Sequence, residues 1–219
     1  MADLLGWNPE DYAALVALAN QMGVHADWLA AVMLSESGMN PNIVNSVGCV
    51  GLIQFCGAKP PLGLTPGQQM PYVGRYYGQF SPPGGWYSRA QIYQANFVPA
   101  TLGHGSDPNL VLARQGDGNY EGNAAAFDLT GKGTITVQDL DDRLDRVIAQ
   151  NPKTWAAVES GIGAAGGTPW MSSPWVKTAA IVVGGLAFGG FGFYIYENRA
   201  YLPQLPRIPA RSRSTRRYA

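Results

Sequence analysis

The sequence predicts a mostly α-helical protein, and two observations carry that prediction. Apolar residues recur at helical spacing after helix-start signals, first after residue 8 and again from about residue 27 to residue 37. No stretch alternates apolar and polar residues over the length of a strand. Of the 219 residues, 46% are hydrophobic and 14% are charged, so the chain can bury a core and is not a disordered protein.

The first predicted helix has signals at both of its ends. Asn8 can cap it, Pro9 suits the first helical position, and Gly23 can end it. The second predicted helix ends near Ser37, and loops rich in glycine and proline follow it, notably over residues 57–71. These signals predict a helical body at the start of the chain.

Residues 128–139, DLTGKGTITVQD, resemble a calcium-binding EF-hand loop and precede a predicted helix over residues 140–148. Lys132, however, places a cation at the fifth position, where an oxygen ligand belongs. We therefore expect a structural turn, with Thr136 and Asp139 capping the helix, and no cofactor. The alternative is a weak calcium site with these oxygen ligands: Asp128, Thr130 and Asp139.

The two cysteines and two histidines indicate no metal site. Two cysteines exclude a disulfide-framework miniprotein and a four-cysteine zinc fold, and His25 and His104 are isolated. Cys49 and Cys56 lie seven residues apart, so their sulfurs are too distant for a disulfide if the intervening residues are helical. We therefore expect a buried thiol at Cys49.

The longest uncharged apolar stretch covers residues 178–196. A helix of nineteen residues spans about 28 Å, close to the hydrocarbon thickness of a bilayer. We expect a transmembrane helix over residues 175–197, entered through a Gly-rich linker over residues 161–174. The first 25 residues show no pattern of a secretory signal peptide. A single-pass protein of a virion membrane or of the host cell envelope accounts for both features.

The charge balance divides the chain into unlike parts. Residues 1–177 carry a net charge of −5, whereas residues 198–219 hold six arginines and no acid. After a membrane span, such a tail fixes the topology. Contact with nucleic acid or with anionic lipid is the other role open to it.

Glu36 is the residue whose position most suggests chemistry. It lies four residues after Val32 and seven after Leu29, so the three share one helical face. A carboxylate on an apolar face loses hydration, which raises its pKa toward the range that a general acid needs near neutral pH. From spacing alone, a merely solvated glutamate at a helix end remains open.

The run ESGMNPNIVNSVGCVGLIQF over residues 36–55 carries a resemblance. Its pattern, Glu-Ser-x-x-x-Pro followed by Gly-x-x-Gly-Leu-x-Gln, resembles the signature of the soluble lytic transglycosylase family. The matching residues are Glu36, Ser37, Pro41, Gly48, Gly51, Leu52 and Gln54. The resemblance implies a lysozyme-like transglycosylase domain over residues 1–127, extended by the EF-hand-like loop and helix over residues 128–160.

The resemblance also implies an activity, namely cleavage of the β-1,4 bond between N-acetylmuramic acid and N-acetylglucosamine in peptidoglycan. Glu36 would protonate the glycosidic oxygen and then take the proton of the C6 hydroxyl, which closes a 1,6-anhydro ring. The residues support this route independently, because residues 37–106 contain no acid. Glycosidases that use two carboxylates hold them about 5–10 Å apart. A hydrolase of the goose-type lysozyme class, which also relies mainly on one glutamate, is the alternative.

The resemblance assigns substrate-binding roles to residues around Glu36. Asn45 takes a position at which the family usually has serine, and its amide can still donate a hydrogen bond. The Ala-Tyr-Asn-Ala-Gly motif of the family is missing, and Tyr93 and Tyr120 are the candidates for its tyrosine. We favour Tyr120, which Asn123 closely follows. The expected substrate-binding residues are Ser37, Asn45, Gln54, Tyr120 and Asn123.

The combination of these parts suggests where the protein works. A transglycosylase-like head with a membrane span and no signal peptide is similar to bacteriophage virion enzymes that open peptidoglycan locally during genome entry. Its expected partners are peptidoglycan, a lipid membrane and other virion proteins. A non-catalytic structural membrane protein of the virion is the third hypothesis, and intact Glu36 and Gln54 argue against it.

Overall fold

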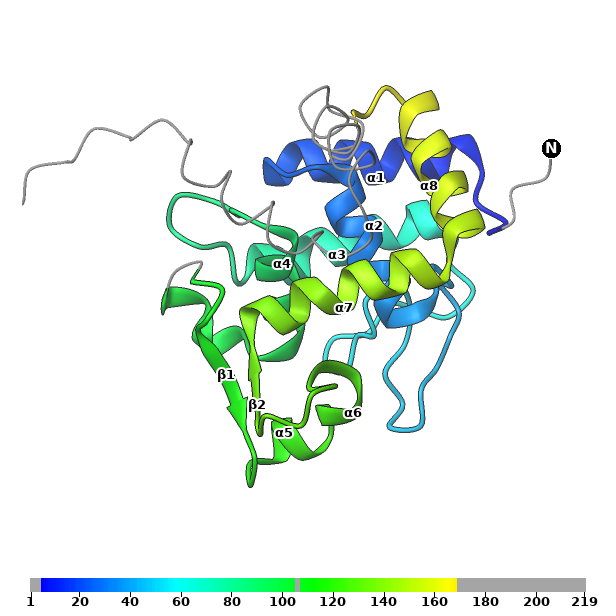
Figure 1. The fold of residues 1–219 in the computed structure, drawn as a ribbon. Coiled ribbons are helices and arrows are strands. Elements are labelled where there is room, and N and C mark those ends of the chain that lie inside the picture. Colours follow the sequence, from blue (N-terminus) through cyan, green and yellow to red (C-terminus); the bar gives the residue numbers. More distant parts are fainter. Residues whose placement is uncertain (1–4, 105–106, 169–219) are drawn as a thin grey trace, which may run out of the picture. The chain divides into compact units, whose positions relative to one another are not determined.

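A computed structural model describes residues 5–104 and 107–168 (Figure 1). Two strands, β1 (Val111–Arg114) and β2 (Thr134–Thr136), and one 3-10 helix, η1 (Pro99–His104), accompany the α-helices in this part of the chain. The α-helices are α1 (Pro9–Met22), α2 (Ala26–Ser37), α3 (Pro66–Gly78), α4 (Arg89–Phe97), α5 (Gly118–Glu121), α6 (Ala124–Phe127), α7 (Val137–Gln150) and α8 (Pro152–Ala164). The predicted, mostly α-helical class is confirmed.

The first helix begins and ends as its sequence predicts. The Asn8 side chain accepts a hydrogen bond from the backbone N–H of Asp11, and the Asp11 carboxylate accepts one in return from the Asn8 N–H. Pro9 occupies the first turn. Gly23 ends α1 in the left-handed region, at φ 68°.

Helix α2 lies at the centre of the core. Its side chains are buried on several faces, and α1, α4, α7 and α8 all contact it. Figure 1 shows α7 crossing in front of α2 and α4. Residues 128–164 thus lie in the same compact unit as α2.

Helix α8 extends past the predicted start of the linker at residue 161. It continues to Ala164, and Ile162 is fully buried. A Cβ at position 161 would lie 2.4 Å from the Tyr12 ring, so Gly161 allows α8 to approach α1 closely. Gly161, which the sequence places at the start of a linker, therefore lies at a helix–helix contact.

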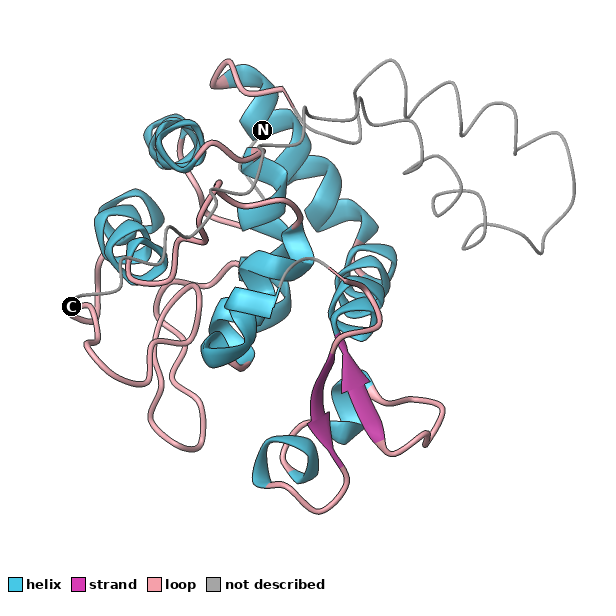
Figure 2. Ribbon diagram, turned by 90° about the vertical axis from the view of Figure 1, so that its left-hand side faces the viewer, coloured by secondary structure: helices cyan, strands magenta, loops and turns pink. Residues whose placement is uncertain are grey.

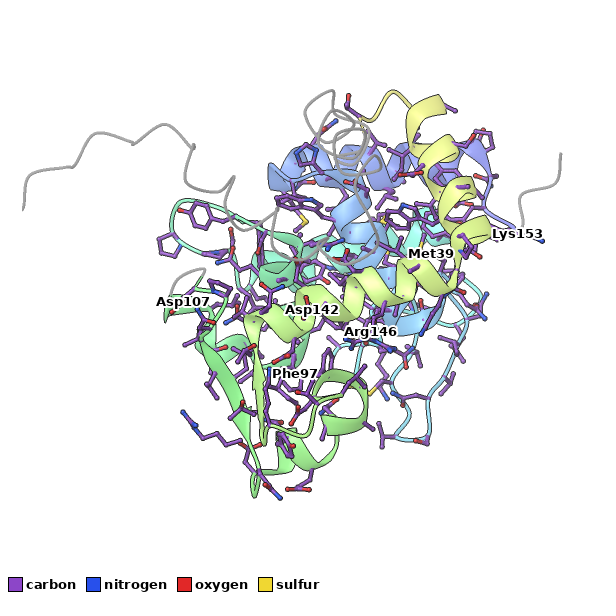
Figure 3. All side chains as sticks on the ribbon, in the orientation of Figure 1. Met39, Phe97, Asp107, Asp142, Arg146 and Lys153 are labelled. Atoms are coloured by element: carbon purple, nitrogen blue, oxygen red, sulfur yellow. A yellow bond between two sulfur atoms is a disulfide. The ribbon has the colours of Figure 1, made fainter. Side chains whose placement is uncertain are left out.

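The strands β1 and β2 pair antiparallel, next to the short helices α5 and α6 (Figure 2). The Arg146 guanidinium of α7 donates to the Ala126 carbonyl at 2.7 Å. The ring of Phe97, at the end of α4, packs on Phe127 with centroids 5.3 Å apart. These two contacts attach α6 to the larger helices, and Figure 3 labels Arg146 and Phe97.

The loop over residues 128–139 is closed by hydrogen bonds and an ion pair. The Asp128 carboxylate accepts from the backbone N–H groups of Lys132 and Gly133. The Lys132 ammonium lies 2.6 and 2.7 Å from the two carboxylate oxygens of Asp139. Thr136 and Asp139 form the predicted capping pair of α7, which is confirmed. The described residues contain no group of three or more His, Cys, Asp or Glu side chains placed to hold a metal ion.

Burial and hydrogen bonding act in opposite directions on the pKa of Asp128. Desolvation, the largest single influence, acts to raise it. Hydrogen bonds from the Tyr120 hydroxyl, from the backbone N–H groups of Lys132 and Gly133 and from Thr130 together lower it to about 2. Asp128 therefore stays ionised and holds the turn through its own hydrogen bonds.

Within the described ranges, no helix has the length and apolar character needed to cross a membrane. The predicted transmembrane helix over residues 175–197 and the basic tail over residues 198–219 lie outside the residues that the structure describes.

Candidate active site

Glu36 lies in the last turn of α2, one residue before the helix ends. Gly38 stops α2 by adopting a left-handed conformation with φ 61°. The Glu36 side chain is half-buried. Desolvation raises its pKa to about 7, although a hydrogen bond with Tyr93 and the positive charge of Arg143 act in the opposite direction. Near neutral pH the carboxyl group is thus present in both protonation states.

Three helices converge on this carboxyl group. The Tyr93 hydroxyl of α4 lies 2.9 Å from the Ser35 hydroxyl of α2. The Arg143 guanidinium of α7 donates to the same Ser35 oxygen at 3.3 Å. Tyr93 and Arg143 are 57 and 107 residues beyond Glu36 in the chain, so only the fold brings these groups together.

Tyrosines dominate the surroundings of Glu36. Burial, followed by the negative charge of Glu36, raises the pKa of Tyr93 and that of Tyr77 well above the ordinary tyrosine value. The pKa of Tyr76 is raised for the same two reasons. These phenols therefore stay protonated at neutral pH, and they can donate hydrogen bonds without adding charge.

The loop that follows α2 is fixed to the end of that helix. The buried Ser37 hydroxyl contacts the carbonyl oxygens of Met33 and Leu52, each at 2.9 Å. The side chain of Gln69, buried in α3, accepts from the Leu52 N–H and donates to the Pro41 carbonyl. The end of α2, the loop and α3 therefore form one hydrogen-bonded support beneath Glu36.

Comparison with protein families identifies the segment that contains the end of α2 and the first part of the loop after it. Residues 15–60 match the family model of the Transglycosylase SLT domain. The chain carries an SLT-type segment. This family comprises lytic transglycosylases that act on peptidoglycan. The match supports a place in the lytic transglycosylase and lysozyme-like family, although it covers less than half of the chain. No curated protein and no solved structure matches the chain significantly.

The SLT match ends before several of the groups that surround Glu36. The matched residues include Glu36, Ser37 and the loop as far as Pro60. Tyr93 and Arg143 follow the match, and α4 and α7 supply them. The SLT segment thus provides the acid, while later elements provide the hydroxyl and the guanidinium beside it.

Cys49 and Cys56 form a disulfide within the SLT segment, so the prediction of a free buried thiol is wrong. The intervening residues form turns rather than a helix, and Val50 pairs in isolated bridges with Val44 and Phe55. The chain therefore reverses direction, and the Cα atoms of the two cysteines lie 4.2 Å apart.

Gln54 also lies in a turn. Its backbone is left-handed at φ 53°. Its half-buried side chain donates to the Gly51 carbonyl at 3.0 Å. Gly51 is itself left-handed at φ 78°, and a Cβ there would lie 2.6 Å from the Gln69 side-chain oxygen. Glycine at position 51 thus lets the loop lie against α3.

The remaining predicted substrate-binding residues lie in other surroundings. The exposed Asn45 accepts hydrogen bonds from the backbone N–H groups of Val47 and Cys49 and so shapes the loop. Tyr120 donates to Asp128 at 2.8 Å, beside the two-stranded sheet. Asn123 is half-buried and bonds to the Asn119 carbonyl.

Of the two candidate tyrosines, the structure brings Tyr93 to Glu36, although the sequence favoured Tyr120. Sequence reasoning also missed Arg143 and Gln69. The sequence of α7 gave no sign that Arg143 would face Glu36 across a hundred residues. The only available signal for Gln69 was a polar residue on the apolar face of a helix.

Proposed function

We propose that the protein cleaves the MurNAc-β-1,4-GlcNAc bond of peptidoglycan and leaves a 1,6-anhydro end, with Glu36 as the catalytic acid and base. The observation that carries the proposal is the half-buried carboxyl group of Glu36, whose pKa is raised to about 7 beside the Tyr93 hydroxyl. A group with this pKa can give up a proton and take one back near neutral pH.

In the first step, the protonated Glu36 donates its proton to the glycosidic oxygen. The bond between that oxygen and C1 of the muramoyl sugar breaks, and positive charge develops on the ring. Glu36 is then an anion. The Tyr93 hydroxyl and the positive charge of Arg143 both favour this ionised form, because each acts to lower the pKa of Glu36.

In the second step, the Glu36 carboxylate accepts the proton of the C6 hydroxyl on the same muramoyl sugar. The C6 oxygen attacks C1 and closes the anhydro ring. The proton returns to Glu36, which restores the starting state. No water is consumed, so the enzyme needs no second carboxylate to activate one.

The positions of the other acids favour this single-carboxylate route. Residues 37–106 contain no Asp or Glu. On α7, near Arg143 in sequence, Asp141 and Asp145 both form ion pairs with Arg89. A hydrolase on the same fold would instead place water on C1, and its product would carry a reducing end.

The variant Glu36→Gln tests the assignment of the acid. It removes the exchangeable proton while keeping nearly the same shape, so release of muropeptides from purified peptidoglycan should stop while the circular dichroism spectrum is unchanged. The control is Glu10→Gln, on the exposed first turn of α1, which should release muropeptides at the wild-type rate. Equal release by wild type and Glu36→Gln would refute the assignment.

We further propose that residues 175–197 anchor the enzyme in a membrane of a phage virion or of the host envelope, where it opens peptidoglycan locally during genome entry. The uncharged apolar stretch of nineteen residues and the arginine-rich tail after it support the anchor. The full chain should need detergent for extraction, whereas residues 1–168 should not. The truncation must keep all of α8, because Ile162 is fully buried.

A further inference from the structure

A second feature lies next to the loop that supports Glu36. A pocket of about 270 Å³ is lined from one side by the end of the loop, including Phe55 and Lys59. From the other side it is lined by α3, including Tyr72, Arg75 and Tyr76. Two cations and three aromatic rings therefore face one cavity.

The two cations of this pocket have no acidic partner within the described part of the chain. Among the described residues, neither Lys59 nor Arg75 has a carboxylate within ion-pair distance. The Lys59 ammonium donates to the Gly48 carbonyl at 2.6 Å, and the Arg75 guanidinium lies 4.5 Å from the Tyr72 ring centroid. Lysine has three N–H donors and arginine has five, so among the described residues each cation has donors beyond these contacts.

The local sequence makes this pocket positive although the body of the chain is acidic. No Asp or Glu occurs between residues 37 and 106, which include both lining segments. Residues 1–177 as a whole carry a net charge of −5. An isolated positive pocket on an acidic protein attracts anionic groups selectively.

The pocket adjoins the surroundings of Glu36. The Tyr76 ring lines the pocket and meets the Phe55 ring edge-on, with centroids 6.1 Å apart. The Tyr76 hydroxyl donates to the Ala95 carbonyl of α4, two residues after Tyr93. Tyr76 thus connects the pocket to the helix that places a hydroxyl at Glu36. The negative charge of Glu36 also acts on Tyr76, whose ring lines the pocket.

We propose that this pocket binds the acidic stem peptide that the muramoyl sugar carries, with Lys59 and Arg75 pairing its carboxylates and Tyr72 and Tyr76 packing against its backbone. The inference rests on the proposed function, because the stem peptide is part of that substrate. It adds a specificity: the enzyme prefers glycan strands that keep their peptides over strands from which an amidase has removed them. Guanidinium and carboxylate groups form the strongest hydrogen-bonded pairs available to such a ligand.

The test compares the two kinds of glycan strand as substrates for the full chain in detergent. The wild type should show a kcat/KM roughly tenfold higher on strands with peptides than on stripped strands. The loss of one charge-assisted hydrogen bond lowers kcat/KM by about this factor. The double variant Lys59→Gln/Arg75→Gln should lose this preference while keeping the wild-type rate on stripped strands. The matched control, Arg114→Gln/Lys153→Gln, changes two exposed cations far from the pocket in sequence, and it should keep the preference; Lys153 is labelled in Figure 3.

The outcomes separate the pocket from the catalytic proposal. A wild type that cleaves both strands equally well, or a pocket variant that keeps the preference, overturns the pocket proposal and leaves the activity standing. If the wild type cleaves neither kind of strand, the proposed catalytic activity is refuted. A binding measurement then tests the pocket proposal by itself. A synthetic muramoyl tetrapeptide titrated into the Glu36→Gln chain should bind roughly tenfold more weakly after the two pocket substitutions, and an unchanged Kd refutes the pocket.

Discussion

The hydroxyl groups of Tyr93 and Ser35 lie 2.9 Å apart, which places the Tyr93 phenol beside the carboxyl group of the next residue, Glu36. Tyr93 comes from α4, and burial keeps its phenol protonated. The pair joins a helix of the SLT segment to a helix outside it. It also gives Glu36 a neutral hydrogen-bond donor whose effect can be measured.

Substitution of Tyr93 by phenylalanine should change both the rate and its pH dependence. Loss of a hydrogen bond to a developing carboxylate should lower kcat roughly tenfold or more. The Tyr93 hydroxyl lowers the pKa of Glu36, so its removal should move the alkaline limb of the pH–rate profile to higher pH. The control Tyr87→Phe alters an exposed tyrosine and should leave the profile unchanged. An alkaline limb at the same pH in Tyr93→Phe would show that the Tyr93 hydroxyl does not act on Glu36.

The raised pKa of Glu36 should also appear in the stability of the protein. A carboxyl group whose pKa is about 7 when folded and about 4.5 when unfolded binds more protons in the native state. The free energy of unfolding of the wild type should therefore decrease as pH rises from 4.5 to 7, by up to about 3 kcal/mol from this group. Urea denaturation at several pH values measures it.

The variant Glu36→Gln lacks this titration and serves as the comparison. It should be more stable than the wild type above pH 7, and the difference should vanish below pH 4.5. Glu10→Gln should retain the wild-type dependence on pH. Parallel stability curves for the wild type and Glu36→Gln would mean that the carboxyl group is not desolvated in solution.

The Cys49–Cys56 disulfide should matter for activity as well as for stability. It closes a short loop that presents the Leu52 carbonyl to Ser37 beside Glu36. Reduction, or the double variant Cys49→Ser/Cys56→Ser, should lower the free energy of unfolding by about 2 kcal/mol and reduce kcat/KM. Cys56 is exposed, so a reductant can reach the bond. The double variant is the control, because reductant should not change its activity or its stability. If reductant leaves the kcat/KM and the stability of the wild type unchanged, the proposed role of the disulfide is wrong.

The ion pair between Lys132 and Asp139 should make the turn over residues 128–139 independent of calcium. The ammonium group lies where it neutralises the Asp139 carboxylate, so millimolar calcium should leave the Tm of the wild type unchanged. Lys132→Ala should destabilise the fold by about 1 kcal/mol or less, since Lys132 is partly exposed. Lys132→Asp should make the Tm sensitive to calcium. A clear rise in the wild-type Tm with calcium would show that the metal displaces the lysine.

Local patterns were enough to predict the first two helices, the capping pair of α7 and the place of Glu36 in the last turn of α2. The caps of α1 and α7 depend on residues within one or two turns of each other. Asn8 and Gly23 cap α1, with Pro9 in its first turn, and Thr136 and Asp139 cap α7, as predicted. Glu36 was found because its helical face and the residues after it lie in one continuous run. Such local interactions can be predicted from the sequence without the tertiary fold.

The rest of the site depends on contacts between distant segments. The choice of Tyr120 over Tyr93 relied on neighbouring residues, whereas the fold gives Tyr120 to Asp128 and Tyr93 to Glu36. No disulfide was predicted because a helix between Cys49 and Cys56 would keep the two sulfurs apart, whereas that segment forms turns and Gln54 adopts a left-handed backbone there. Neither outcome is determined by spacing alone.

The most direct test of the central claim is the mass of the sugar ends that the full chain releases from purified peptidoglycan. If Glu36 passes one proton out and back without water, the released muramoyl ends should be 1,6-anhydro sugars, lighter by one water than reducing ends. Muramoyl ends that carry the additional water, or release of glycan that persists in Glu36→Gln, would contradict that mechanism.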